Sequence, residues 1–562
     1  MESYIGRRVE YKGQRGTVRY YGPLRHQTDH PKAKDTWIGV EWDDTSKGTH
    51  NGTVNGFKYF DCAKETGCSL IRYQVANFGI PLIIAAKERY KSYEEMTEEE
   101  KKAESRIEQE MYVDTTKKSK KLAVKLVGKD KAYSKISDLA NLKEVALQSM
   151  QISSIDDGSG LLTKLFTSLE SLYLDGNLLY DWEQYFQILW QLPTLHTISL
   201  TNNKFQKPSP EFIASLPKEK LIHPNLRVVS FIDMGLCWED VDILLPSFEL
   251  LEELWLSHNK CSTISTTYKV RVEYLPNLTS LNLEDNKLSQ WEDIEAFGVL
   301  PKLTDLVLSM NNIRFIPQPK GFKNVSQLLI EENLIDNWES INNLNLFTNL
   351  ARLRITDNPL ENVNERGRIR QQIIARVKGL TWLNLSIVRP TDRKDAELIY
   401  IKTAWEDYVN AAKDKYSQIN TKEEVKDRSK LEKYMKEEFK EKDYMEDKHP
   451  RWAELTTKYG SPIEFIIEKT VQNIQTRSVE LIIRSMCKNS IHKEPVTKKL
   501  PETMTIGALK GLCAKLFGVG VLKQRLSYHQ NKSSFSYDLD DNLRQLAYYG
   551  VANQGEIWIH DK

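Results

Sequence analysis

The chain has 562 residues, and although 28% of them are charged its formal net charge is only +1. This balance excludes a strong bulk attraction to nucleic acid or to an anionic membrane surface. The six cysteines lack C-x-x-C spacing, which argues against a disulfide framework or a zinc site and favours a reducing compartment. No segment approaches the ~18 apolar residues that span a bilayer, and the start resembles no signal peptide, so we expect a soluble intracellular protein of about three or four domains.

Residues 1–86 contain short apolar segments separated by glycine, proline and asparagine. Strands this short, interrupted by turn residues, predict a small antiparallel β-barrel. The glycine-rich segment 47–52 is then expected to form an exposed loop that presents backbone N–H groups outward. The expected strands lie at 16–22, 37–42, 57–60 and 69–72.

The motifs of this region resemble a CAP-Gly domain. They are G-T-V-R-Y at 16–20, W-I-G-V-E at 37–41, a G-x-x-x-G loop at 48–52, G-x-x-Y-F-x-C at 56–62 and a closing arginine at 72. The resemblance implies a groove that captures acidic C-terminal tails ending in an aromatic residue, as on α-tubulin. The groove residues that it implies are Trp37, Lys47, Gly48, Thr49, His50, Asn51, Gly52, Leu70 and Arg72.

Three of these positions depart from the family pattern. Thr49 replaces the usual lysine, Asn51 replaces the usual aspartate, and Leu70 replaces a groove phenylalanine. The lost cation and the lost ring are each expected to cost on the order of 1 kcal/mol, so tail binding is expected to be weak. The alternative is that Trp37 belongs only to the barrel core.

Residues 87–121 are dominated by lysine and glutamate, with few apolar residues between them. This composition predicts a charged helix or tether that separates the barrel from the next domain. We interpret the segment as a charged linker.

Residues 122–390 repeat the pattern L-x-x-L-x-L-x-x-N-x-L every 22 to 31 residues, the period of leucine-rich repeats. Each L-x-L places two apolar side chains on the buried side of a short strand, and the asparagine can turn inward to satisfy backbone groups. Stacked copies predict an α/β leucine-rich-repeat solenoid with one continuous core. The repeated asparagines are Asn177, Asn203, Asn259, Asn286, Asn311, Asn333 and Asn358.

The variable positions of these repeats are expected to line a concave surface. Most are acidic, with Arg352 and Arg354 as basic exceptions. Such a surface favours a folded partner that presents basic or polar patches, although the acids could instead serve only solubility. The residues expected to bind the body of the partner are Tyr173, Trp255, His258, Glu284, Asp285, Glu331, Glu332 and Arg354.

Two further regions follow the repeats. Residues 391–476 mix a helix-forming segment with dense lysine and glutamate, which predicts a capping helix and then an exposed helical connector that acts as a spacer. Residues 477–562 show a β-grasp pattern, with strands expected at 479–483, 496–500, 524–529 and 555–559 and a helix at 505–517. The run L-x-x-Y-G-V-x-x-x-G-x-x-I-x-I resembles ubiquitin-like domains, and without a terminal Gly-Gly it is expected to be a docking module.

The three modules in this order resemble the tubulin-specific chaperone E (tubulin-folding cofactor E) family. The resemblance implies a cytoplasmic, cytoskeleton-associated chaperone that binds α-tubulin and works with other tubulin cofactors in assembling and dissociating the α/β heterodimer. The chain lacks a phosphate-binding loop and an H-E-x-x-H motif, so we expect no enzyme activity, no catalytic residues, no metal and no cofactor. The alternatives are a microtubule-binding CAP-Gly protein and a ubiquitin- or proteasome-pathway adaptor.

Overall fold

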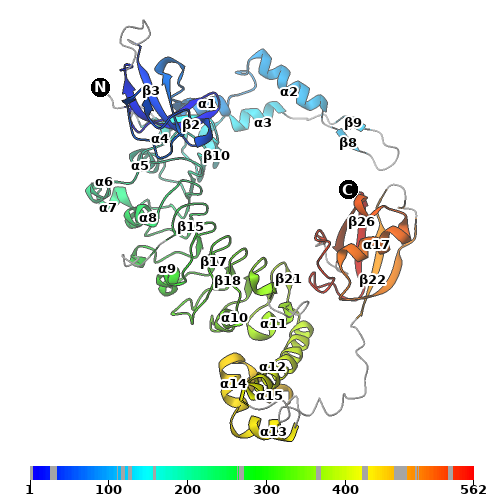
Figure 1. The fold of residues 1–562 in the computed structure, drawn as a ribbon. Coiled ribbons are helices and arrows are strands. Elements are labelled where there is room, and N and C mark those ends of the chain that lie inside the picture. Colours follow the sequence, from blue (N-terminus) through cyan, green and yellow to red (C-terminus); the bar gives the residue numbers. More distant parts are fainter. Residues whose placement is uncertain are drawn as a thin grey trace. The chain divides into compact units, whose positions relative to one another are not determined.

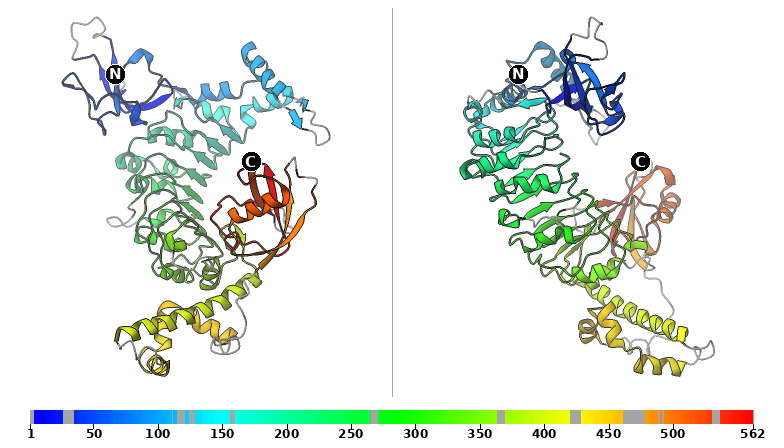
Figure 2. Two further views of the ribbon diagram at one scale, coloured as in Figure 1. Left: turned by 45° about the vertical axis from the view of Figure 1, so that its right-hand side comes forward. Right: turned by 60° about the vertical axis from the view of Figure 1, so that its left-hand side comes forward.

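The computed structural model divides the chain into two compact units. The first comprises Met1–Asn312 and Lys320–Val325, and the second Ile313–Pro319 and Ser326–Lys562. Figures 1 and 2 show their helices and strands. In the described part of the chain, every helix is too short or too polar to cross a membrane. The structure describes residues 4–25, 35–110, 112–114, 121–123, 129–155, 160–262, 264, 271–362, 369–419, 428–460, 478–487, 490, 493–529 and 536–561.

The first unit begins with a four-stranded antiparallel sheet of order β1-β2-β3-β6. One apolar cluster packs around Val18, Ile38 and Val40, and a second one packs around Tyr20 and Phe60. Short antiparallel strands at these positions confirm the predicted strands, whereas the closed barrel stays a prediction. The strands of the sheet are β1 (Arg8–Tyr11), β2 (Gln14–Gly22), β3 (Trp37–Trp42) and β6 (Cys68–Arg72). A separate antiparallel pair is formed by β4 (Thr53–Val54) and β5 (Phe57–Lys58).

Helices and strands lie both at the end of the expected N-terminal domain, residues 1–86, and in the expected linker, residues 87–121. Strand β7 (Ile80–Pro81) pairs in parallel with β11 (Ile152–Ser154), and α1 (Leu82–Arg89) follows it with a buried apolar face. Helix α2 (Glu98–Glu110) is the charged helix that was predicted, but β8 (Tyr112–Asp114) and β9 (Lys121–Ala123) form an antiparallel pair that was not. Positions 111 and 115–120 of the expected linker lie outside the described residues.

Seven parallel strands form the repeat part of the first unit, each three residues long. In each strand the central side chain is buried, as at Leu172, Leu254 and Leu281. The strands are β10 (Glu144–Ala146), β12 (Ser171–Tyr173), β13 (Thr197–Ser199), β14 (Val228–Ser230), β15 (Glu253–Trp255), β16 (Ser280–Asn282) and β17 (Asp305–Val307). The helices are α3 (Lys129–Ile136), α4 (Leu161–Leu165), α5 (Trp182–Gln191), α6 (Pro210–Ser215), α7 (Lys218–Leu221), α8 (Trp238–Leu244) and α9 (Glu292–Glu295).

The repeated asparagines form the predicted network of backbone contacts. Asn177 Oδ1 accepts hydrogen bonds from the backbone N–H groups of Met150 and Ile152, both at 3.0 Å. Its Nδ2 donates to the carbonyls of Leu147 and Leu174 at 2.9 and 2.8 Å. Each buried amide therefore satisfies backbone groups of its own repeat and of the preceding one, which confirms the role expected of this position.

The second unit continues the pattern with β18 (Gln327–Leu329), β19 (Arg352–Arg354) and β20 (Trp382–Leu383), which pair in parallel. Strand β21 (Ser386–Ile387) pairs antiparallel with β20, which breaks the repeat. Helices α10 (Trp338–Leu344) and α11 (Ile369–Arg376) connect these strands.

The region predicted to be an exposed connector is packed in part. Helix α12 (Pro390–Ile419) contacts α13 (Arg428–Glu437), α14 (Glu441–Lys448) and α15 (Trp452–Tyr459), as Figure 2 shows. Aromatic rings pack between these helices. The stacked rings of Trp405 and Trp452 have centroids 6.2 Å apart, and those of Tyr408 and Phe439 have centroids 5.6 Å apart. Part of each of these helices therefore packs against α12, while much of α13 and α14 is exposed, and the spacer role stays a prediction. Positions 420–427 and 461–477 lie outside the described residues.

The last part of the second unit is a five-stranded sheet of order β23-β22-β26-β24-β25 with one helix, α17. Strands β22 and β26 are parallel, and Ile506, Leu509 and Cys513 of α17 are buried in the common core. This arrangement agrees with the β-grasp pattern. The elements are β22 (Ser478–Ser485), β23 (Val496–Pro501), α17 (Ile506–Phe517), β24 (Gln524–His529), β25 (Ser536–Asp538) and β26 (Gly555–Asp561).

Candidate peptide-binding surfaces

The glycine-rich loop of the N-terminal sheet is fixed to β6 by backbone hydrogen bonds. Thr49 N–H donates to the carbonyl of Cys68 at 2.7 Å, and Cys68 N–H donates to the carbonyl of His50 at 3.0 Å. Gly48 allows this approach, because a Cβ there would lie 1.9 Å from the carbonyl oxygen of Thr66. Gly52 ends the loop with φ at +92°, a conformation that L residues rarely adopt. The loop therefore has a defined position beside the sheet.

Three of the predicted groove residues, Trp37, Leu70 and Arg72, meet on one face of the sheet. Strand pairing sets Trp37 opposite Arg72, and Gly39 opposite Leu70. Because side chains alternate along a strand, these positions share a face. Trp37 and Leu70 are half-buried against an apolar cluster that includes Phe60, whereas Arg72 is exposed. The sequence analysis did not place Phe60 in the groove, although its ring occupies the space beside Gly39. The Y-F pair of the G-x-x-Y-F-x-C motif is the sequence feature that could have identified it.

His50 points into the protein and is therefore a poor cation for an acidic tail. Its Nδ1 accepts a hydrogen bond from Gly52 N–H at 3.0 Å, and its Nε2 is buried without a partner among the described residues. Burial lowers the pKa of His50, so the ring is neutral at neutral pH. The remaining loop side chains, Thr49 and Asn51, are exposed, and Lys47 is half-exposed with its Nζ 3.9 Å from Asp44. Among the described residues of the predicted groove, Lys47 and Arg72 are thus the exposed cations.

A disulfide joins Cys62 to Cys68, next to the loop. The sequence analysis expected no disulfide framework, because the six cysteines lack C-x-x-C spacing, so this bond departs from that expectation. In the described part of the chain, Glu41 and these two cysteines form a group whose donor atoms lie within 4.8 Å of one another. Both sulfurs are used in the disulfide, so this group offers no thiolate to a metal ion.

In the first unit, the residues expected on the concave surface occupy two kinds of position. Tyr173 and Trp255 end strands β12 and β15, and Trp255 donates from Nε1 to Glu253 Oε2 at 3.1 Å. His258 and Asp285 lie in the turns after their strands, at φ +57° and +49°, and not on the strands where they were expected. Their side chains meet, with His258 Nδ1 2.8 Å from Asp285 Oδ2. Glu284 is half-buried in the same turn as Asp285.

The second unit holds the other three expected residues. Glu331 Oε1 accepts from Arg354 Nη2 and from Thr356 Oγ1, both at 2.9 Å. Glu332 lies in the turn at φ +51° and is exposed. The structure therefore brings Glu331 and Arg354 together, whereas the side chain of Glu332 is exposed.

Comparisons with known proteins agree with both terminal modules. A CAP-Gly domain model matches residues 5–74, and a ubiquitin-like domain model matches residues 479–562, as the motifs predicted. The solution structure of the C-terminal ubiquitin-like domain of mouse tubulin-specific chaperone E is 27% identical, covers 16% of this chain and 94% of its own, and has a TM-score of 0.15.

Two curated relatives match almost the whole chain. Tubulin-folding cofactor E of Arabidopsis thaliana is 30% identical over 560 residues, which cover 97% of this chain and 95% of the relative. Tubulin-specific chaperone E of Xenopus laevis is 30% identical over 557 residues, which cover 97% and 96%. Similarity of this extent shows that the chain belongs to the tubulin-specific chaperone E family, also called the tubulin-folding cofactor E family.

Proposed function

We propose that this chain is a tubulin-folding chaperone that binds α-tubulin and acts with other tubulin-folding cofactors in assembly and dissociation of the α/β-tubulin heterodimer. The observation that carries the proposal is the similarity over nearly the full length of chaperones with that name. The match includes the repeats as well as the two small terminal domains. A microtubule-binding CAP-Gly protein or a proteasome adaptor would need only one of those small domains, so neither alternative is favoured.

The N-terminal groove is the proposed site for the acidic tail of α-tubulin. Half-buried Trp37 and Leu70 offer an apolar wall, and exposed Arg72 stands beside it. Lys47 and the backbone N–H groups of the 48–52 loop supply the remaining positive potential. Because His50 is turned inward and Thr49 is uncharged, the groove has fewer cations than the family pattern, and we expect modest affinity.

The repeats are the proposed site for the folded body of α-tubulin. In this proposal residues 122–390 form a continuous solenoid between a small barrel at 1–86 and a ubiquitin-like domain at 477–562, joined through residues 87–121 and 391–476. Exposed Glu332 and the half-buried acids near Trp255 would contact basic or polar patches of the partner. The ubiquitin-like domain would dock another cofactor or a ubiquitin-pathway protein.

The chain would perform this work by binding, without a chemical step of its own, and we propose that it acts in the cytoplasm beside the cytoskeleton. The function is tested by adding the purified chain to tubulin dimers together with the other cofactors and measuring polymerisable dimer. We expect the amount of dimer to change and soluble α-tubulin to be retained on the chain. Unchanged dimer levels would contradict the chaperone function, and retention of microtubules or proteasomes instead would support an alternative.

The groove is tested separately with the variant Thr49→Lys. This variant adds a cation where the family loop carries one, so we expect about fivefold tighter binding of an acidic peptide with a free C-terminal tyrosine, measured by calorimetric titration. Thr53→Lys is the matched control, because it adds the same charge on exposed β4 outside the loop. Equal gains in the two variants would indicate nonspecific attraction and would argue against this groove.

A further inference from the structure

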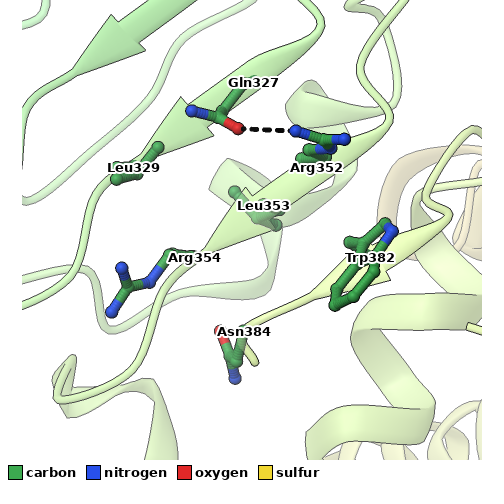
Figure 3. A pocket seen from close by; sticks show the side chains of 7 residues that line it. All are labelled: Gln327, Leu329, Arg352, Leu353, Arg354, Trp382 and Asn384. Carbon is green, nitrogen blue, oxygen red and sulfur yellow. Dashed lines mark hydrogen bonds between the residues drawn. The ribbon is translucent and has the colours of Figure 1, made fainter. Parts of the chain in front are cut away.

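The second unit contains a pocket on the face of its repeat strands that lies opposite the core. Its volume is about 370 Å³. The middle residues of β18 and β19, Leu328 and Leu353, and the second residue of β20, Leu383, are buried at 0 to 1% exposure. The residues next to them on each strand therefore project to the other face. Figure 3 shows the residues that line the pocket, Gln327, Leu329, Arg352, Leu353, Arg354, Trp382 and Asn384.

Strand register arranges the lining side chains in two rows. Gln327, Arg352 and Trp382 are direct neighbours in one row, and Leu329 and Arg354 are neighbours in the other. Arg352 and Arg354 are two residues apart on β19, so their Cα atoms lie roughly 6.5 Å apart along the strand. The pocket therefore holds two guanidinium groups at the spacing of alternate side chains in an extended peptide.

Hydrogen-bond donors with unused capacity dominate this pocket. Arg352 is exposed, and its only bond within the described residues is a long one from Nη1 to Gln327 Oε1 at 3.4 Å (Figure 3). Asn384 Oδ1 accepts from Ile355 N–H at 3.0 Å, which leaves its NH₂ group without a protein partner in the part that the structure describes. The indole N–H of Trp382 is likewise unpaired there. Several hydrogen-bond donors with unused capacity in one pocket favour the binding of an anion, which can accept their hydrogen bonds.

The charge of the pocket favours a carboxylate over a phosphate. Glu331 neutralises Arg354 through the 2.9 Å ion pair, so Arg352 supplies the net positive charge. One uncompensated guanidinium matches a singly charged carboxylate, which its planar fork can hold with two hydrogen bonds. The face of Trp382 and the half-buried side chain of Leu329 offer apolar contacts that a free inorganic anion would not use.

We propose that this pocket binds an extended acidic peptide segment of a partner protein, with one carboxylate on Arg352 and apolar atoms of the segment against Trp382. An extended segment running along β19 would place its alternate side chains over Arg352 and Arg354. The pocket lies in the second unit and shares no residue with the N-terminal groove. It is a second site for acidic peptide, and it does not depend on the proposed tubulin function.

The test is a fluorescence-anisotropy titration of the full chain with a labelled decapeptide of alternating glutamate and valine. Its C-terminus is amidated, so that it lacks the terminal carboxylate that a tail-binding groove would recognise. Arg352→Glu is expected to weaken binding by about tenfold or more, because it replaces the key cation with a repelling charge. Arg352→Lys keeps the positive charge but lacks the planar guanidinium group that can hold a carboxylate with two hydrogen bonds. We therefore expect it to reduce the peptide affinity by less than Arg352→Glu does.

Lys394→Glu is the matched control, since it makes the same charge change on an exposed residue of α12 outside the pocket. It is expected to alter the affinity by less than about twofold. Circular dichroism confirms that each variant is folded. Equal weakening by Arg352→Glu and Lys394→Glu, or unchanged binding to Arg352→Glu, would overturn the proposal. Displacement of the peptide by low-millimolar inorganic phosphate would identify a phosphate site instead and would also overturn it.

Discussion

The repeats and the helical region of residues 390–459 bury polar groups in different ways. In the repeats the recurring buried group is a neutral amide, such as Asn311 at 4% exposure, whose partners belong to its own repeat and the one before it, although single charged groups such as Asp293 are buried there too. In the helical region the buried groups are ions. Glu397 is 1% exposed, and Arg451, 54 residues later, reaches it at 3.2 Å. Lys458 and Tyr459 both donate to its second oxygen at 2.8 Å.

The difference teaches how each region depends on its buried polar residues. Burying an amide has a modest desolvation free energy, and its hydrogen bonds need only backbone groups that every repeat provides. The same hydrogen-bond arrangement can therefore recur along the chain. Burying a carboxylate has a much larger desolvation free energy, so the buried charge is stable only when several donors from distant parts of the sequence bind it. The helical region should therefore be more sensitive than the repeats to loss of one polar side chain and to pH.

The largest effect is expected for Glu397→Ala. The variant leaves Arg451 buried beside Glu454 and the Ala375 carbonyl with one counter-charge removed, and losing a buried partner typically costs about 3–5 kcal/mol. Hydrogen exchange of α12 and α15, read by mass spectrometry, should show this loss as a lower free energy of opening. Glu406→Ala on exposed α12 surface is the control, with an expected change of at most about 0.5 kcal/mol. Equal protection in the two variants would remove the distinction between the regions.

A smaller effect is expected for Asn311→Ala in the repeats. The variant leaves the backbone N–H groups of Asn286 and Leu288 without their 3.0 Å acceptor, and unsatisfied buried donors cost about 1–3 kcal/mol. The neighbouring residue provides the control, because Asn312 is exposed and its substitution by alanine should cost less than about 0.5 kcal/mol. Hydrogen exchange of β16 and β17 measures both. A loss for Asn311→Ala that exceeded that of Glu397→Ala would reverse the comparison.

The same contrast explains what the sequence could predict. The strands, the asparagine network and the β-grasp elements follow from local periodicity, because the residues that make each contact recur at fixed spacing. The helices of residues 390–459 were predicted but their packing was not, because it is made by rings such as Tyr408 and Phe439, 31 residues apart and set among lysines and glutamates. Charge density along the chain indicated a solvated surface, whereas the buried face depends on long-range contacts.

Only part of the candidate groove could be predicted, because the direction of a side chain depends on contacts that a motif does not contain. Sequence motifs located its strands and its loop, and strand pairing brings Trp37, Leu70 and Arg72 to one face as that motif order implied. The inward orientation of His50 could not be predicted, because it depends on the hydrogen bond from Gly52 N–H and on the burial of the ring near Phe60. A match to a family loop identifies the residue type at a position and not the direction of its side chain.

The smallest expected effect is the response of the helical region to mild acid. Burial, together with the nearby charges of Arg376 and Lys448, lowers the pKa of His449 to about 3, against 6.5 for an ordinary histidine. Below pH 6.5 the unfolded chain therefore binds a proton at His449, whereas the folded chain does not. The contribution of His449 to the free energy of unfolding is thus fully present above pH 6.5 and falls towards pH 3. The hydrogen bonds of Glu397 overcome its burial and hold its pKa below 4.5, so its own contribution is lost only at lower pH.

Between pH 7 and pH 5.5, His449 should thus reduce the opening free energy of α14 and α15 by roughly 1 kcal/mol. Hydrogen exchange corrected for intrinsic rates measures this change, and His449→Gln should flatten it, because glutamine does not titrate. The amides around Asn286 and Asn311 should change less over the same range, since their buried partners carry no titratable group. An equal response in the repeats, or an unchanged slope in His449→Gln, would show that the neutral and ionic regions do not differ in the way proposed.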